Sequence, residues 1–202
     1  MRKEFIVELI TGLMERGVSD RNILDKFAEE VCGIIDKHVK YIVVSGFVAI
    51  SHGRFRTTED IDMIIEKISF ERFRELHNDL IKNGFECIQS SKADDIYEYL
   101  KNGDGVRYVR AGTFLPPEME IKFAKDEIDE IQLNTRKKLP FTGLDIWFSS
   151  IEMNIAFKEE LLKSDKDVED AKHLRRIYEG EVRNEEVDKI KKMIRRLRLH
   201  ER

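Results

Sequence analysis

Two aspartates separated by a single residue carry the clearest chemistry in this chain. Asp60 and Asp62 belong to Asp60-Ile61-Asp62-Met63-Ile64, in which acidic and apolar residues alternate as in a half-buried strand. Because successive side chains of a strand point to opposite faces, both carboxylates lie on one face, roughly 6–7 Å apart. Carboxylate oxygens are ligands that Mg²⁺ accepts, together with waters and substrate phosphates. We therefore expect Asp60 and Asp62 to bind two Mg²⁺ ions, or Mn²⁺ in their place.

A phosphate site is predicted beside these ions. Two divalent ions about 3.5–4 Å apart can activate an attacking hydroxyl and neutralise a leaving pyrophosphate. Tyr41–Val44 predicts a buried strand, which leads into Ser45-Gly46 and a short helical segment. Small residues at such a turn expose backbone N–H groups and a helix N-terminus, which bind anions. We expect Ser45 to add a hydroxyl donor and Gly46 to let the backbone approach the phosphates.

A third carboxylate is expected from another strand. In Glu118-Met119-Glu120-Ile121-Lys122-Phe123 the apolar residues share one face, and the two glutamates and the lysine share the other. Glu120 is the preferred third acid, because apolar residues flank it inside the strand whereas Glu118 adjoins a Pro-Pro turn. The sequence leaves both glutamates open.

These residues resemble the nucleotidyltransferase superfamily, which has the DNA polymerase β-like fold and a Gly-Gly or Gly-Ser turn followed by Asp-x-Asp or Asp-x-Glu. The resemblance is closer to the minimal nucleotidyltransferases of bacteria and archaea, including the AbiEii-type toxins, in which a His-Gly-like segment precedes Arg-x-Thr-x-Asp-x-Asp. Ser45 departs from this pattern, because a glycine usually stands there. The matching positions are Gly46, His52, Gly53, Arg56, Thr58, Asp60 and Asp62.

The resemblance also implies roles for these positions and for two later segments. It implies that Asp60 and Asp62 are metal ligands and that Glu120 is the third acid. Ile155-Ala156-Phe157-Lys158 resembles the helical lysine segment of the family, and Lys166-Asp167-Val168-Glu169-Asp170 resembles its Lys-Asp-x-x-Asp element. Lys158 would then contact the triphosphate, and the later segment would orient its helix or the nucleotide. The implied nucleotide-binding residues are Ser45, Gly46, Arg56, Thr58, Lys158, Lys166, Asp167 and Asp170.

Each of these signals also has a purely structural interpretation. An Asp-x-Asp pair can be a solvated strand edge, and His52 is better explained as a structural residue at a helix end than as a general base. Lys158 stands among glutamates and can be an ordinary surface ion-pair lysine. Lys166 and Asp170 are four residues apart, a spacing that stabilises a helix without any further role. Arg54 can steer phosphates or merely solvate a loop.

The elements that must position these residues alternate between helix and strand. This alternation indicates an α/β (α+β) fold, a small mixed sheet flanked by N-terminal and C-terminal helices. We divide the chain into an N-terminal helical region (1–38), a nucleotidyltransferase core (39–147) and a C-terminal helical region (148–202). Periodicity predicts helices at 4–14, 20–38, 47–52, 70–82 and 93–101, strands at 41–44, 61–65, 85–88, 106–110 and 119–123, and three helices after Trp147.

Charge dominates the composition. Asp, Glu, Lys and Arg make up 38% of the 202 residues, with a formal net charge of −4, whereas a soluble domain has about 25%. No apolar run approaches the ~18 residues of a membrane span. Cys32 and Cys87 are too few for a disulfide scaffold. We therefore expect a cytoplasmic protein with two reduced, buried thiols and no membrane partner.

The C-terminus differs from the rest of the chain in charge. Residues 183–202 contain eight Lys or Arg and four Asp or Glu. A basic helix of this kind can bind nucleic acid or an acidic partner. The preferred interpretation is an amphipathic helix that packs Ile190, Met193, Ile194 and Leu197 while its charges face water.

The sequence therefore predicts a metal-dependent nucleotidyltransferase. It would transfer an NMP from an NTP to a hydroxyl of RNA, a protein or a small molecule and release pyrophosphate. Two other classes stay open. One is a non-catalytic binding protein that kept the fold, such as a toxin–antitoxin component with a cognate protein partner. The other is a nucleic-acid-binding adaptor that uses the C-terminal helix.

Overall fold

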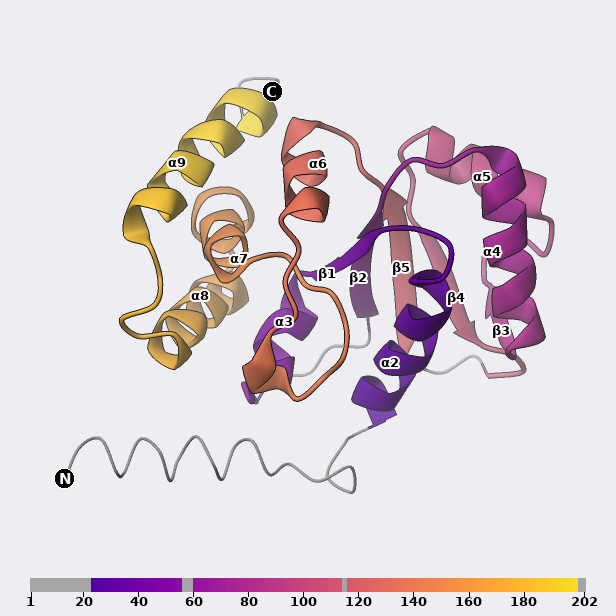
Figure 1. Ribbon diagram of the computed structural model, residues 1–202, viewed down its shortest axis with the longest axis horizontal. Coiled ribbons are helices and arrows are strands. Elements are labelled where there is room, and N and C mark those ends of the chain that lie inside the picture. Colours follow the sequence, from indigo (N-terminus) through magenta and orange to yellow (C-terminus); the bar gives the residue numbers. More distant parts are fainter. Residues whose placement is uncertain (1–22, 56–59, 114–115, 200–202) are drawn as a thin grey trace.

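A computed structural model of the protein describes residues 23–55, 60–113 and 116–199. A five-stranded sheet lies at its centre with helices on both sides (Figure 1). The strands are β1 (Tyr41–Val44), β2 (Asp60–Ile65), β3 (Phe85–Cys87), β4 (Val106–Arg110) and β5 (Glu118–Phe123). The α-helices are α2 (Ile23–Ile35), α3 (Gly46–Ser51), α4 (Phe70–Lys82), α5 (Ala93–Lys101), α6 (Glu127–Asn134), α7 (Ile151–Phe157), α8 (Asp165–Ile177) and α9 (Asn184–Ile194). Three shorter helical turns are η2 (Pro140–Thr142), η3 (Lys158–Leu162) and η4 (Arg195–Leu199).

The sheet is mixed, as the sequence predicts. Its strand order is β1-β2-β5-β4-β3. Strands β2 and β5 are parallel, and the other three neighbouring pairs are antiparallel. The two strands that carry the predicted acids are therefore direct neighbours that run in the same direction.

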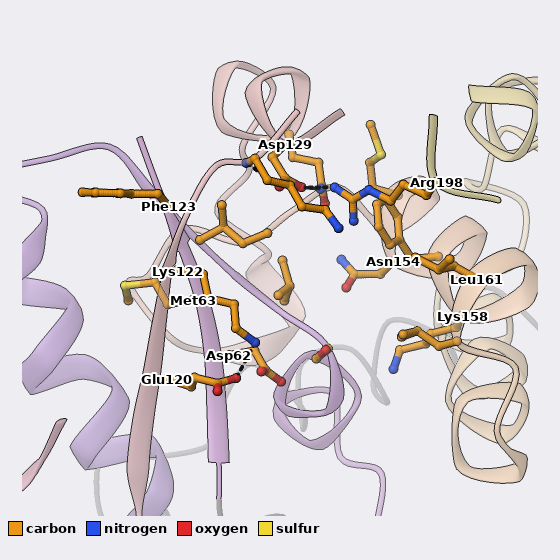
Figure 2. A pocket seen from close by; sticks show the side chains of 18 of the residues that line it. Asp62, Met63, Glu120, Lys122, Phe123, Asp129, Asn154, Lys158, Leu161 and Arg198 are labelled. Carbon is orange, nitrogen blue, oxygen red and sulfur yellow. Dashed lines mark hydrogen bonds and ion pairs between the residues drawn. The ribbon is translucent and has the colours of Figure 1, made fainter. Parts of the chain in front are cut away.

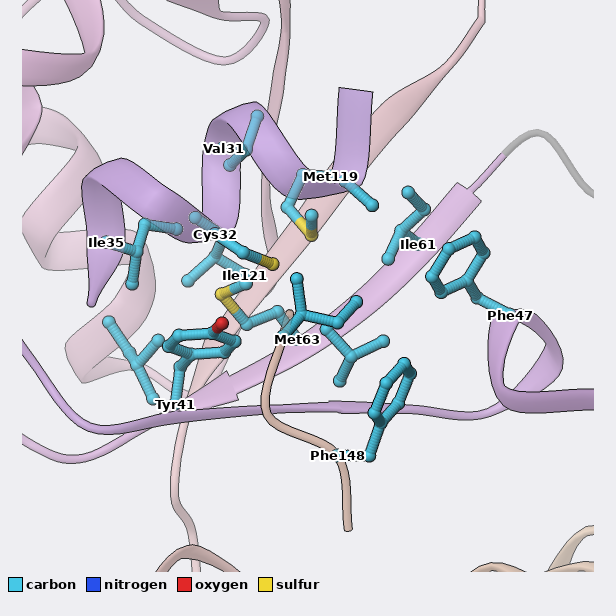
Figure 3. Close-up of a cluster of buried hydrophobic side chains, with 14 of the residues drawn as sticks. Val31, Cys32, Ile35, Tyr41, Phe47, Ile61, Met63, Met119, Ile121 and Phe148 are labelled. Atoms are coloured by element: carbon cyan, nitrogen blue, oxygen red, sulfur yellow. The ribbon is translucent and has the colours of Figure 1, made fainter. Parts of the chain in front are cut away.

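One face of the sheet forms the main hydrophobic core. Ile61 and Met63 of β2 and Met119 and Ile121 of β5 are at most 1% exposed. Figure 3 shows these side chains beneath α2, whose residue Cys32 is buried among them. The alternation of β2 and β5 thus places Ile61, Met63 and Ile65 of the Asp-x-Asp strand in the core, and it directs the acids to the opposite face.

The opposite face of the sheet is covered only in part. Helix α6 packs on β1 and β2, where Ile42, Ala124 and Leu133 form a small buried cluster. Val44 and Ile64 pack against this cluster. Beyond it Asp62 of β2 and Glu120 and Lys122 of β5 face a cavity.

The C-terminal helices form one packed unit. Helix α7 packs against α8 and α9, and α8 packs against α3 (Figure 1). Val187, Ile190 and Ile194 of α9 are buried, so the prediction of a packed amphipathic helix is confirmed. Basic residues of this segment pair with acids of the body: Arg183 with Glu152, Lys191 with Glu159, Arg195 with Glu160, Arg196 with Glu127, and Arg198 with Asp126 and Asp129.

Most elements predicted within the described residues agree with the structure, but α6 was missed, and the helix predicted at 4–14 lies outside the described residues. Helix α4 has the predicted bounds, since Ser69 accepts a hydrogen bond from the Arg72 N–H at its start and Gly84 follows its end with φ +81°. Helix α6 has only eight residues, too few for a clear periodic pattern, and the Asp126 side chain caps its N-terminus. Buried residues from all three predicted regions belong to one hydrophobic cluster.

Candidate active site

The parallel register of β2 and β5 sets four acids opposite one another. Asp60 is paired with Glu118, and Asp62 is paired with Glu120. In both pairs the two side chains hydrogen-bond each other. The sequence expectation that Asp60 and Asp62 share a face with the glutamates of β5 is therefore met by the geometry.

Asp62 is the more enclosed of the two aspartates. Burial raises the pKa of Asp62 most, and the negative charge of Glu120 raises it further. A hydrogen bond from Ser45 lowers the same pKa by a smaller amount. A carboxyl pair of this kind needs a shared proton or a cation between its oxygens. Asp60, at the exposed start of β2, lies beside Glu118.

Basic side chains hold both glutamates. Lys122 Nζ lies 2.7 Å from Glu120 Oε2, and Arg107 Nη2 lies 3.3 Å from Glu120 Oε1. Arg107 Nε lies 3.0 Å from Glu118 Oε1. Burial alone raises the pKa of Glu120, but Lys122 and Arg107 outweigh it and keep that pKa below its ordinary value. Burial and the charge of Asp60 raise the pKa of Glu118, so the two glutamates differ in their readiness to ionise.

The turn before α3 has the backbone of a glycine turn although it contains a serine. Ser45 has φ 64° and ψ −137°, a conformation that side chains with a Cβ rarely adopt. Gly46 begins α3 directly after it. Ser45 thus holds a backbone conformation that a glycine would adopt freely.

A cavity of about 390 Å³ opens between the acids and the C-terminal helices. Figure 2 shows Asp62, Glu120 and Lys122 on one side of it and Asn154 and Lys158 on the other. Ser45, Gln132, Phe157, Leu161 and Arg198 complete much of the wall. The cavity therefore joins the acids of the sheet to the helical lysine segment, which lies far from Asp62 in the sequence.

Lys158 belongs to a buried charge network. Its side chain is 1% exposed, and Nζ lies 2.8 Å from Asp170 and 3.5 Å from Asp167. Arg54 also pairs with Asp170, and it donates to the carbonyl of Lys166 at 3.0 Å. The interpretation of Lys158 as a surface lysine is therefore wrong, because the residue is fully buried.

The other residues of this network connect α8 to the rest of the molecule. Asp167 and Ser164 cap the N-terminus of α8 reciprocally, and the Lys166 side chain is exposed. Arg54 links the end of α3 to α8 through Asp170 rather than solvating a loop. The Lys-Asp-x-x-Asp segment thus fixes the position of α8 against α3 and η3.

His52 has the structural role predicted for it. Its ring is buried at the end of α3, with Nδ1 2.6 Å from the Val48 carbonyl and Nε2 2.8 Å from the Tyr178 hydroxyl. Burial lowers the pKa of His52 to about 4. The histidine joins α3 to α8 and does not line the cavity.

The remaining expectations concern the Arg-x-Thr segment, metal clusters, membrane spans and thiols. Arg56 and Thr58 lie outside the described residues. Within residues 23–55, 60–113 and 116–199, no three His, Cys, Asp or Glu side chains are grouped so that they could hold a metal ion without further ligands. No helix of the described chain is both long and apolar enough to span a bilayer. Cys32 and Cys87 are free and buried, as predicted.

Several cavity residues were not found from the sequence. Gln132, Asn154 and Arg198 carry no motif, and each comes from a different element. The same holds for Arg107 of β4, which does not line the cavity but holds both glutamates. The Asn154 amide donates to the carbonyls of Ser149 and Ser150. Only the order of strands and the packing of α6, α7 and η4 bring these side chains to the acids.

Solved structures share this architecture. No protein-family model and no curated protein sequence matches the chain. An antigenic nucleotidyltransferase-like protein from Paracoccidioides brasiliensis is similar with a TM-score of 0.53 and 16% identity, over 88% of this chain and 89% of that one. The structure of ANT(2″)-Ia in complex with adenylyl-2″-tobramycin has a TM-score of 0.53 and 14% identity, over 87% of this chain and 98% of that one. The chain therefore shares the fold of these two structures, in agreement with the fold that its motifs predicted.

Proposed function

We propose that the protein is a metal-dependent nucleotidyltransferase, which transfers an NMP from an NTP to a hydroxyl acceptor and releases pyrophosphate. The register that pairs Asp60 with Glu118 and Asp62 with Glu120 beside a cavity is the observation that carries this proposal. The shared fold supports it, and so does the adenylyl-2″-tobramycin that one of the similar structures holds in complex.

The acids fit the chemistry of a divalent cation. Their donors are all carboxylate oxygens, as Mg²⁺ prefers. Asp62 and Glu120 lie close enough to hydrogen-bond, so a cation between them would replace the shared proton. In this proposal Asp60, Asp62 and Glu120 hold two Mg²⁺ ions, or Mn²⁺. When bound, these ions would neutralise charge on the reacting phosphate and lower the pKa of the attacking hydroxyl.

The protein's own groups position the reactants. Ser45 lies at the cavity edge and Gly46 follows it at the start of α3; in this proposal both would bind the triphosphate, with Lys158 on the opposite wall. Glu120 would accept the proton of the acceptor hydroxyl. The acceptor oxygen then forms a bond to the α-phosphorus while the bond to the bridging oxygen breaks, and the electron pair leaves with pyrophosphate. Arg56 and Thr58, whose positions match the family motif, would contact the nucleotide in the same proposal.

Product analysis tests this proposal directly. The protein is incubated with Mg²⁺ and each α-labelled NTP in turn, together with host RNA or lysate, and labelled products are separated by size and by nuclease or protease sensitivity. Transfer of label that requires the metal supports the enzyme and reveals whether the acceptor is RNA, a protein or a small molecule. If no NTP is bound or consumed while one protein partner co-purifies, the non-catalytic binding protein is the better description.

A further inference from the structure

The loop between α5 and β4 comes unusually close to the third acid. Gly105 in this loop has no side chain, and a Cβ built on it would lie 2.6 Å from Glu120 Oε1 and 2.8 Å from Lys122 Cε. The same atom would lie 2.9 Å from Glu120 Cδ. Non-bonded carbon atoms in folded proteins make favourable contacts at about 3.5–4.0 Å. The Glu120 carboxyl and the Lys122 side chain therefore occupy the space that any other residue at 105 would fill.

The conformation of the backbone does not explain this glycine. Gly103, two residues earlier, has φ +87°, which accounts for a glycine there. Gly105 is not among the residues with positive φ, so its backbone is open to residues with a Cβ. The requirement for glycine at 105 comes from the neighbouring side chains of β5.

The space at Gly105 determines where Glu120 can lie. Glu120 is bound from three directions: Lys122 at 2.7 Å, Arg107 at 3.3 Å and the hydrogen-bonded Asp62. Arg107 follows Gly105 by two residues, at the start of β4. One short stretch of chain thus supplies both the cation that holds Glu120 Oε1 and the gap in which this oxygen lies.

We propose that Gly105 is a positioning residue for Glu120. Its missing side chain leaves room for the carboxyl between Asp62 of β2 and Arg107 of β4, where Lys122 also holds it. This inference rests on the proposed function, in which Glu120 activates the acceptor hydroxyl. A methyl group at 105, on the β4 side of Glu120, would displace the flexible ends of Glu120 and Lys122 from their positions between Arg107 and Asp62. It would not open the hydrophobic core, because the atoms it meets are the far ends of cavity side chains.

The first experiment compares Gly105→Ala with Gly33→Ala. Gly33 lies in α2, and a Cβ there meets nothing within 4 Å, so it controls for the glycine-to-alanine change itself. We expect Gly105→Ala to lower kcat at least tenfold with KM for the NTP changed less than threefold, because Glu120 acts on the acceptor side. Mn²⁺ titration followed by electron paramagnetic resonance should show weaker binding in Gly105→Ala and unchanged binding in Gly33→Ala. Wild-type kcat and Mn²⁺ affinity in Gly105→Ala would overturn the inference.

A double substitution separates positioning from a general structural role. Glu120→Asp shortens the acid by one methylene and withdraws it from the added methyl group. We expect Gly105→Ala to reduce kcat at least tenfold in the wild-type background and less than threefold in the Glu120→Asp background. Equal losses in both backgrounds would contradict a role through Glu120. If the unsubstituted protein transfers no NMP, the proposed function fails, whereas transfer that is insensitive to Gly105→Ala contradicts only the role of Gly105.

Discussion

Asp62 and Glu120 stand opposite each other on two parallel strands, and their side chains share a hydrogen bond. The residues next to them in the sequence, Ile61 and Ile121, point into the main core and are at most 1% exposed. The burial of these neighbours therefore fixes the face of the sheet on which the two acids lie. A shift of register by one residue would move the acids into the core and the apolar residues to the cavity.

Substitutions of Ser45 should separate the backbone of the turn from its hydroxyl. Since Ser45 has φ 64° and ψ −137°, Ser45→Gly removes strain of about 1–3 kcal/mol, part of which the greater freedom of glycine in the unfolded chain offsets. Ser45→Ala keeps the strain and loses the hydrogen bond to Asp62. We expect the free energy of unfolding, measured with a denaturant, to be higher for Ser45→Gly than for wild type and lower for Ser45→Ala. A Ser45→Gly variant less stable than Ser45→Ala would contradict this view of the turn.

Removal of the buried lysine should destabilise the C-terminal helices. Lys158 is 1% exposed and its partner Asp170 is 0% exposed, so Lys158→Met removes one of the two cations that pair with a buried carboxylate. Breaking such a pair costs about 3–5 kcal/mol. The matched control is Lys166→Met, because Lys166 is an exposed lysine of α8. Its substitution should change the free energy of unfolding by no more than about 0.5 kcal/mol. Similar unfolding midpoints for the two variants would show that the network contributes little to stability.

The buried histidine should make the stability of the protein depend on pH. The pKa of His52 falls from 6.5 to about 4 on folding, so the unfolded chain binds a proton between these values that the folded protein does not. Its contribution is fully present above pH 6.5 and is lost as the pH falls to about 4. The free energy of unfolding lost over this range is about 3 kcal/mol, because a pKa difference of one corresponds to 1.36 kcal/mol.

The control for this pH dependence is His52→Gln, measured beside wild type in urea at several pH values between 7 and 4. Glutamine can still reach the Tyr178 hydroxyl but does not titrate. We expect the loss of stability on acidification to be smaller in the variant by about this amount. Parallel pH profiles for the two proteins would mean that other groups cause the acid sensitivity.

The sequence predicted the fold and the acids better than it predicted their surroundings. Alternating residues in β2 and β5 were enough to place Asp60, Asp62 and Glu120 on one face, because the pleat of a strand is a local property. The register that joins Asp62 to Glu120 rather than to Glu118 is not local, since it depends on how β2 and β5 pair.

The charged residues around the acids could not have been found in this way. Arg107 reaches Glu118 and Glu120 from β4, and Arg198 reaches the cavity from the end of the chain. Lys158 stands among glutamates in the sequence but is buried by the packing of η3 against α8. Contacts of this kind depend on tertiary packing, which short motifs do not encode.

The role of the paired acids is tested most directly by one double variant, Asp60→Ala with Asp62→Ala. Metal-dependent transfer of label from an α-labelled NTP is measured in parallel with wild type, and circular dichroism and thermal unfolding check that the fold is retained. We predict that transfer falls by at least about 10³-fold, as expected when charge stabilisation of the transition state is removed. Transfer by the folded double variant at the wild-type rate would contradict the proposed function.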